Sequence, residues 1–203
     1  MTKTSGFDAD ALSTELTALP HKLQTAFALL VAERLYPALI AYSRETGGDE
    51  AWRLRTFLDQ IWSGLERNAL DLERAREMAE EIYELRPETE DNPSSISSYA
   101  LDAVGAAWEA LQNVITGNPQ HAVAAARIAF ESVYMFQEEH EGYEPQNVVD
   151  QKAILGRNAV LDELRLERLQ LERAKTFRHS PSEGVSALRR EFGHVARSFH
   201  GLG

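Results

Sequence analysis

Apolar residues recur every three or four positions along most of this 203-residue chain, a spacing that places them on one face of an α-helix. No segment shows the alternation of apolar and polar residues that is typical of a β-strand. The pattern therefore predicts an all-α fold, a single-domain bundle of about seven or eight helices. The predicted helices cover approximately residues 8–19, 21–45, 49–65, 71–85, 97–115, 119–136, 148–177 and 185–199.

Three of these helices have features that bear on the fold. The helix over residues 97–115 is apolar around most of its circumference, which predicts a central position. The helix over residues 148–177, in the C-terminal half, is the longest and would span roughly 45 Å. In the helix over residues 21–45, a kink or break is expected near Tyr36 and Pro37, because a proline removes a backbone donor and clashes with the preceding turn.

Composition supports one folded domain with an uneven charge. Hydrophobic residues make up 43% of the chain and charged residues 26%, so a sizeable core can form. The formal net charge is −11, which opposes general binding to a phosphate backbone. From Arg165 onward, however, eight basic residues outnumber four acidic ones. We therefore divide the chain into a helical domain over residues 1–178 and an amphipathic basic segment over residues 179–203, packed or partly flexible.

The sequence contains no recognisable catalytic or cofactor motif. It has no cysteine, which excludes disulfides, thiolate metal sites and cysteine nucleophiles. It has neither a glycine-rich nucleotide loop nor a Gly-x-Ser-x-Gly nucleophile elbow. A di-iron bundle needs two Glu-x-x-His pairs, and only Glu191 and His194 have that spacing. No catalytic residue, cofactor or metal is therefore predicted, and the sequence favours a non-enzymatic protein.

The chain also lacks signals for export or membrane insertion. Residues 1–7 do not show the basic and apolar pattern of a signal peptide. No stretch approaches the roughly 18 consecutive apolar residues that cross a bilayer. We therefore expect a cytoplasmic protein without a membrane partner.

The candidate functional residues gather around Arg34. Arg34 follows Phe27 by seven positions and Leu30 by four, so its charge lies on or beside the apolar face of the helix. Burying an unpaired guanidinium is very unfavourable, whereas a bidentate carboxylate satisfies it. We identify Asp59 as the partner, because it lies three residues before Trp62 at the edge of an apolar stripe.

This candidate cluster has two interpretations. It is either a charged pocket for a small molecule or an internal ion pair that fixes the packing of two helices, and the second interpretation is favoured. The residues concerned are Glu33, Arg34, Tyr36, Pro37, Asp59, Trp62 and Asp102.

Four short strings carry a resemblance to a known family. They are FALLVAERLYP at residues 27–37, DQIW at residues 59–62, ALDA at residues 100–103 and HAV at residues 121–123. In this order they resemble the YjaG-like bacterial family known as domain of unknown function 416, over about residues 15–175. The resemblance implies an all-α helical fold and no assigned reaction, so it transfers no catalytic residue. Beyond Phe177 no similar string is found, which would make the basic segment particular to this protein.

Three classes of function remain open. The leading hypothesis is a non-enzymatic module that binds a protein partner, or a second copy of itself through the long helix or the faces rich in small residues. An acidic immunity-type inhibitor of a basic toxin is one form of it, because complementary charge speeds and directs such encounters. The second class is a small-molecule binder or enzyme with a pocket around Arg34, Asp59 and Trp62. The third, nucleic-acid binding by the basic segment, is the least favoured.

Overall fold

The computed structural model describes residues 6–87, 96–140 and 158–193. Helices joined by short turns make up these segments, and no β-strand occurs within them. The predicted all-α, multi-helix fold is thereby confirmed. In chain order the helices are α1 (Ala9–Thr17), α2 (His21–Thr46), α3 (Glu50–Arg67), α4 (Leu72–Tyr83), α5 (Ser97–Thr116), α6 (Gln120–His140), α8 (Asn158–Thr176) and α9 (Pro181–Phe192).

Local sequence explains where several helices begin and end. The Asp8 carboxylate accepts a hydrogen bond from the Ala11 amide at 3.1 Å and so caps α1. Gly47 and Gly117 follow α2 and α5 in the left-handed conformation, with φ of 74° and 69°, where glycine carries no steric penalty. Asp49 occupies the cap position of α3, although its side chain makes no capping hydrogen bond.

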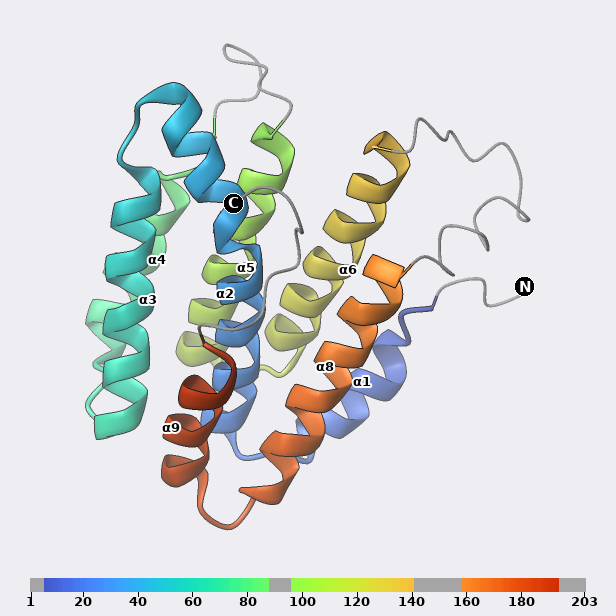
Figure 1. Ribbon diagram of the computed structural model, residues 1–203. Coiled ribbons are helices and arrows are strands. Elements are labelled where there is room, and N and C mark those ends of the chain that lie inside the picture. The colour runs from blue at the N-terminus through green and yellow to red at the C-terminus, as the bar shows by residue number, and fades with distance from the viewer. Residues whose placement is uncertain (1–5, 88–95, 141–157, 194–203) are drawn as a thin grey trace.

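Pro37 lies inside α2, which continues through it as one helix from His21 to Thr46. The interruption expected at this point is therefore a bend and not a break. Beyond the proline, the last turns of α2 lean toward α3 (Figure 1). The helix survives because a proline removes only one intrahelical hydrogen bond, the one to the carbonyl of Glu33, while neighbouring helices hold the turns on either side.

Helices α2 and α5 form the centre of the bundle. They pack against each other, with α3 and α4 on one side and α6, α8 and α1 on the other (Figure 1). Alanines allow the close approach of α5 and α6, because a methyl side chain lets helix backbones come near. The buried alanines are Ala100, Ala103, Ala106, Ala107 and Ala110 of α5 and Ala122, Ala125, Ala126 and Ala129 of α6.

By length and composition alone, α2 is apolar enough to cross a membrane. In the bundle, however, 78% of the most apolar 18-residue stretch of α2 is buried. A helix that is apolar on several sides is expected in the core of a bundle. The apolar character of α2 is therefore explained by its central position.

The C-terminal part of the described chain is packed against the bundle. Helix α9 contacts α2, α3 and α8, and Val185 and Leu188 are fully buried. Gly184 permits a tight fit, because a Cβ atom there would lie 2.5 Å from Phe177 and 2.8 Å from Leu23. Residues 148–157 of the predicted long helix and residues 194–203 of the basic segment lie outside the described residues, as does the loop 88–95.

Candidate functional site

Glu33 and Arg34 are adjacent in the sequence but contact different helices. Successive residues of an α-helix point roughly 100° apart, so neighbours face different sides. Arg34 reaches α8, whereas Glu33 reaches α3. The single cluster expected around Arg34 is therefore two separate networks on opposite flanks of α2.

The first network, which we call the Arg34 cluster, consists of Arg34, Glu163, Glu167 and Gln170. Arg34 is completely buried, and its Nε and Nη2 atoms donate to Glu163 Oε1 at 3.0 and 2.7 Å. Its Nη1 atom donates to Gln170 Oε1. The predicted pairing with Asp59 is therefore wrong, because α8 supplies the carboxylate from the other side of α2.

Glu167 is the unusual member of the Arg34 cluster. Its Oε1 atom lies 4.0 Å from Arg34 Nη2, and it has no hydrogen-bond partner among the described residues. Burial raises the pKa of Glu167 to about 8, the nearby Glu163 carboxylate adds to this rise, and Arg34 opposes it. At neutral pH Glu167 is therefore mostly protonated.

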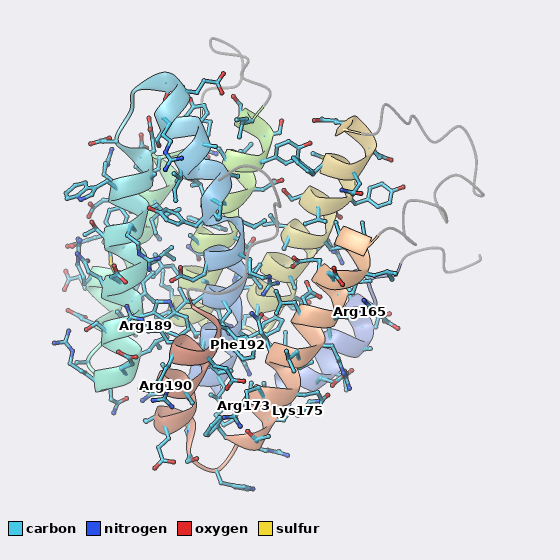
Figure 2. All side chains as sticks on the ribbon, viewed as in Figure 1. Arg165, Arg173, Lys175, Arg189, Arg190 and Phe192 are labelled. Atoms are coloured by element: carbon cyan, nitrogen blue, oxygen red, sulfur yellow. The ribbon has the colours of Figure 1, made fainter. Side chains whose placement is uncertain are left out.

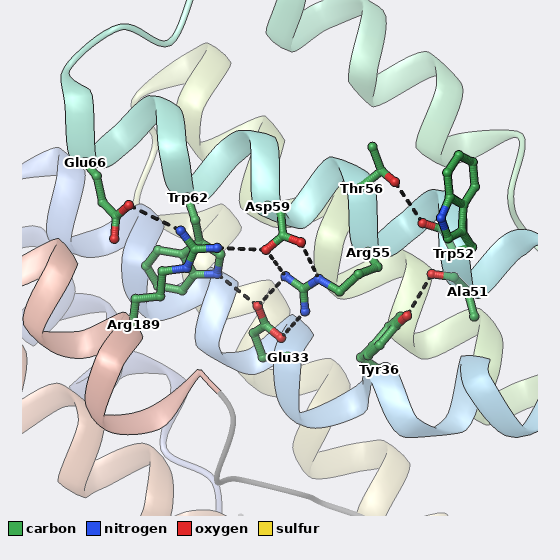
Figure 3. A network of polar contacts seen from close by, with 10 residues as sticks. All are labelled: Glu33, Tyr36, Ala51, Trp52, Arg55, Thr56, Asp59, Trp62, Glu66 and Arg189. Atoms are coloured by element: carbon green, nitrogen blue, oxygen red, sulfur yellow. Dashed lines mark hydrogen bonds and ion pairs between the residues drawn. The ribbon is translucent and has the colours of Figure 1, made fainter.

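The second network, which we call the Glu33 network, joins α2, α3 and α9 (Figure 3). Arg55 donates to both carboxylate oxygens of Glu33, at 2.6 and 2.8 Å, and Trp62 Nε1 donates to Glu33 Oε1 at 3.0 Å. Asp59 accepts from Arg55 and from Arg189 Nη2, the latter at 2.7 Å. These contacts fix α9 and α3 to the central helix.

Aromatic side chains complete the Glu33 network. The guanidinium of Arg189 lies 5.8 Å from the centre of the Trp62 ring, and that of Arg55 lies 5.5 Å from the Tyr36 ring. The Tyr36 hydroxyl donates to the carbonyl of Ala51 at 2.8 Å (Figure 3). Burial raises the pKa of Tyr36, so this hydroxyl keeps its proton. Ion pairs, hydrogen bonds and cation–π contacts thus join these helices.

Replacing Glu33 with alanine is expected to lower the free energy of unfolding by about 2–3 kcal/mol. The substitution leaves the buried Trp62 N–H without its acceptor and removes the bidentate partner of Arg55. Urea unfolding measures this change. Glu77→Ala, which removes an exposed glutamate of α4, serves as the control and is expected to change stability by less than about 0.5 kcal/mol. Equal effects of the two substitutions would contradict this assignment.

Asp102 joins neither network. It lies on α5 beside Ser132 and Glu131 of α6. Burial raises the pKa of Asp102 to about 6, the charge of Glu131 adds to this rise, and the nearby Ser132 hydroxyl opposes it. Pro37 contributes through the shape of α2. Of the seven candidate residues, Glu33, Tyr36, Asp59 and Trp62 therefore come together, while Arg34, Pro37 and Asp102 lie elsewhere.

Five residues of the two networks were not predicted from the sequence. They are Glu163, Glu167 and Gln170 of α8, Arg55 of α3 and Arg189 of α9. The sequence could have placed the three α8 residues in the core, because positions 163, 167 and 170 share a helix face with the buried Val160, Leu171 and Ala174. A polar side chain at a helix position that faces the core needs a buried hydrogen-bond or charge partner.

Figure 2 labels basic residues of α8 and α9, among them Arg173, Lys175 and Arg189. Most basic residues of these two helices pair with acidic residues of the same chain. Arg173 pairs with Glu191 at 2.9 Å, and Arg189 pairs with Asp59 and Glu66. Such pairs neutralise the charge that a nucleic-acid surface needs to display. Helices α2, α6 and α9 pack against α8, where Val160, Leu171 and Ala174 are buried, while Leu169 is 56% exposed.

The described surface includes an α4–α5 groove and an α1–α8 cavity. The α4–α5 groove has a volume of about 360 Å³, and the α1–α8 cavity has a volume of about 140 Å³. The groove is lined by Arg76, Ala79, Glu80, Tyr83, Glu84, Trp108, Gln112 and Ile115. Neither hollow includes a residue of the Glu33 network, and the cavity alone reaches the Arg34 cluster, through Glu167. No group of three His, Asp or Glu side chains suited to a metal occurs in the described part of the chain.

These features define a helical-bundle protein with charged networks on both flanks of its central helix. The chain belongs to the DUF416 family, described as proteins of unknown function, whose model matches residues 11–202. The match continues past Phe177, so the expectation that the basic segment is particular to this chain is wrong. No curated protein matches the chain.

A solved structure shows the same fold. The chain resembles the crystal structure of a DUF416 family protein from Shewanella baltica OS155, with a TM-score of 0.76 and 19% sequence identity. The likeness covers 93% of each chain. At this identity the comparison establishes the shared helical fold and transfers no function.

Proposed function

We propose that this chain is a protein-interaction module that binds a basic amphipathic helix of a partner protein in the α4–α5 groove. The main support is a groove with aromatic and aliphatic walls and a rim on which Glu80 and Glu84 outnumber Arg76. Tyr83 is 45% exposed, and Trp108 and Ile115 are half-buried in the walls. A groove between two helices suits the apolar face of a third helix, which enters with anchors about one helical turn apart.

Charge decides which kind of helix fits this groove. The surface of α4 and its C-terminal cap carries five glutamates and two arginines. Arg74 pairs with Glu77 and Glu81 at 2.9 and 2.8 Å, and Arg76 lines the groove beside Glu80 and Glu84, so the surface keeps a net negative charge. A partner that carries Lys or Arg beside its apolar face would meet complementary charge, which speeds and orients association. The glutamates concerned are Glu73, Glu77, Glu80, Glu81 and Glu84.

An acidic inhibitor that covers a basic protein is one form of this function. The proposal places the interaction in the cytoplasm, and the burial of the apolar helix α2 within the bundle supports a protein that works outside a membrane. It assigns no reaction to the chain, and the ion pairs that fill the Glu33 network support a structural role for those residues.

A fluorescent amphipathic peptide tests the proposal. We expect a helical peptide with leucines on one face and lysines on the other to bind the wild-type protein, as measured by fluorescence anisotropy. Tyr83→Ala is expected to weaken binding about tenfold or more, because it removes an aromatic anchor from the groove. Trp52→Ala is the matched control, since Trp52 is 70% exposed on α3 and lies outside the groove.

Three outcomes would contradict the proposal. The first is equal binding of the peptide to wild-type protein and Tyr83→Ala. The second is equal binding of a peptide in which glutamates replace the lysines, because the acidic rim should repel it. The third is a wild-type dimer in sedimentation experiments that Tyr83→Ala dissociates, which would assign the groove to a second copy of this chain.

A further inference from the structure

Helix α5 carries an apolar stripe that the bundle does not fully cover. In the described part of the chain α5 packs mainly against α2, α4 and α6 (Figure 1). A helix that is apolar around most of its circumference is expected to be covered on every side, yet one line of residues along α5 stays partly exposed. Apart from Gln112 the residues of this line are apolar. We call it the α5 stripe, and its members are Leu101, Gly105, Trp108, Gln112 and Ile115.

The spacing of the α5 stripe suits a second helix lying along it. Its members follow one another at intervals of four, three, four and three residues, which is the spacing of the seam between two helices of a coiled coil. The stripe extends over roughly 21 Å, at about 1.5 Å per residue. The α4–α5 groove includes only Trp108, Gln112 and Ile115. Leu101 and Gly105 continue the same line beyond the groove.

Gly105 leaves room for another helix to approach the α5 stripe. A Cβ atom at this position would have only Ile128 Cδ1 within 4 Å, at 3.6 Å, which is an ordinary contact. The packing of the bundle therefore does not require glycine here, although glycine inside a helix is destabilising relative to alanine. A position without a side chain on a partly exposed line lets the backbone of a neighbouring helix come close, since interhelical distance depends on the side chains at the contact.

Carboxylates border the α5 stripe on both edges. Two of them directly follow a stripe residue on α5, and two come from α4 across the stripe. On each edge they outnumber the basic side chain beside them, which is His121 on the α6 side and Arg76 on the α4 side. A helix with Lys or Arg on both edges of its apolar face would meet complementary charge along the stripe. The four carboxylates are those of Asp102 and Glu109 on α5 and of Glu80 and Glu84 on α4.

We propose that the partner helix docks lengthwise along the whole α5 stripe, from Ile115 to Leu101. This inference rests on the proposed function, because it extends the footprint of the same basic amphipathic helix beyond the α4–α5 groove. The recognised segment is then a helix of about 18 residues with an apolar seam and basic residues on both edges of that seam. A helix confined to the groove needs only about 11 residues.

Two peptides of different length test the extended footprint on the full chain. An 18-residue and an 11-residue peptide share the leucine and lysine pattern and the same net charge, and a side-chain staple keeps both helical. Fluorescence anisotropy is expected to show at least tenfold tighter binding of the 18-residue peptide, because it alone reaches Leu101. Tyr83→Ala is expected to weaken the binding of both peptides, since both occupy the groove.

Gly105→Gln separates the two parts of the footprint. The added side chain stands on the line between the groove and Leu101, and the space around position 105 allows the bundle to fold with it. This variant is expected to weaken binding of the 18-residue peptide at least tenfold and to leave binding of the 11-residue peptide unchanged. Ala11→Gln adds the same group at an exposed position of α1, outside the stripe, and is expected to bind both peptides as the wild type does.

The outcomes distinguish this inference from the proposed function. Equal binding of the two peptides to the wild-type protein, or wild-type binding of the 18-residue peptide by Gly105→Gln, would overturn the extended footprint. If Tyr83→Ala still weakened binding in that case, the groove itself would remain the docking site. Absence of binding of either peptide to the wild-type protein would overturn both proposals.

Discussion

Arg34→Met is expected to lower the free energy of unfolding by about 3–5 kcal/mol, the usual cost of removing one partner from a buried ion pair. The methionine fills much of the volume, but Glu163 loses both hydrogen bonds from the guanidinium and Gln170 loses its donor. Equilibrium unfolding in urea measures the loss. Arg34 is fully buried, so solvent cannot replace these contacts without opening the packing of α2 against α8.

Two further variants make this expectation specific to the ion pair. Arg165→Met removes an arginine of α8 that is 73% exposed and pairs with Asp162, and it is expected to change stability by less than about 0.5 kcal/mol. Arg34→Met combined with Glu163→Met removes both charges and is expected to recover much of the loss. Unchanged melting of Arg34→Met would show that the cluster does not hold α8 to α2.

Glu167→Gln is expected to remove a large part of the pH dependence of stability. In the folded protein the pKa of Glu167 is raised by burial to about 8 from an ordinary value of 4.5. The folded state therefore holds a proton that the unfolded state releases, and stability falls as the pH rises from about 5 to about 8. The loss is on the order of 3 kcal/mol, since each pKa unit corresponds to about 1.4 kcal/mol and the structure relaxes around a buried charge.

Thermal melting between pH 5 and pH 9 measures this effect. Asp102 also makes stability fall with rising pH, and this loss is complete near its pKa of about 6. The Glu167→Gln variant is therefore expected to lose stability between pH 5 and about pH 6 and not between pH 6 and pH 8. Above pH 8, Glu167→Gln is expected to be more stable than the wild type. Glu183→Gln, at an exposed position of α9, is expected to keep the wild-type profile. A Glu167→Gln profile identical to that of the wild type would contradict the assignment.

The fold was largely predictable because its determinants are local. Apolar periodicity places α2, α3 and α5 within a few residues of their predicted bounds, and glycine after α2 and α5 ends each helix in the left-handed conformation. The bend at Pro37 was foreseen, whereas the continuity of α2 through it depends on neighbouring helices that no local pattern reveals.

The candidate site was predictable only in part. Sequence indicated that Arg34 is buried and needs a carboxylate, and both statements hold in the structure. The prediction that Asp59 pairs with Arg34 was wrong, because α2 has neighbours on several sides and adjacent residues face different helices. The sequence does not show which helix lies on which side of α2. Glu163 was detectable from its place in the apolar register of α8. Arg189 contacts Asp59 and Trp62, which are far from it in the sequence, and no local sequence pattern predicts these contacts.

The three tryptophans of the chain distinguish a binding surface in the α4–α5 groove from a structural role of the charged networks of α2. Trp108 lines the groove, Trp62 is buried in the Glu33 network and Trp52 is exposed on α3. The measurement is an NMR titration of the indole N–H signals with the basic amphipathic peptide. We expect the Trp108 signal to shift while those of Trp62 and Trp52 stay in place. A shift of Trp62 with Trp108 unmoved would contradict it.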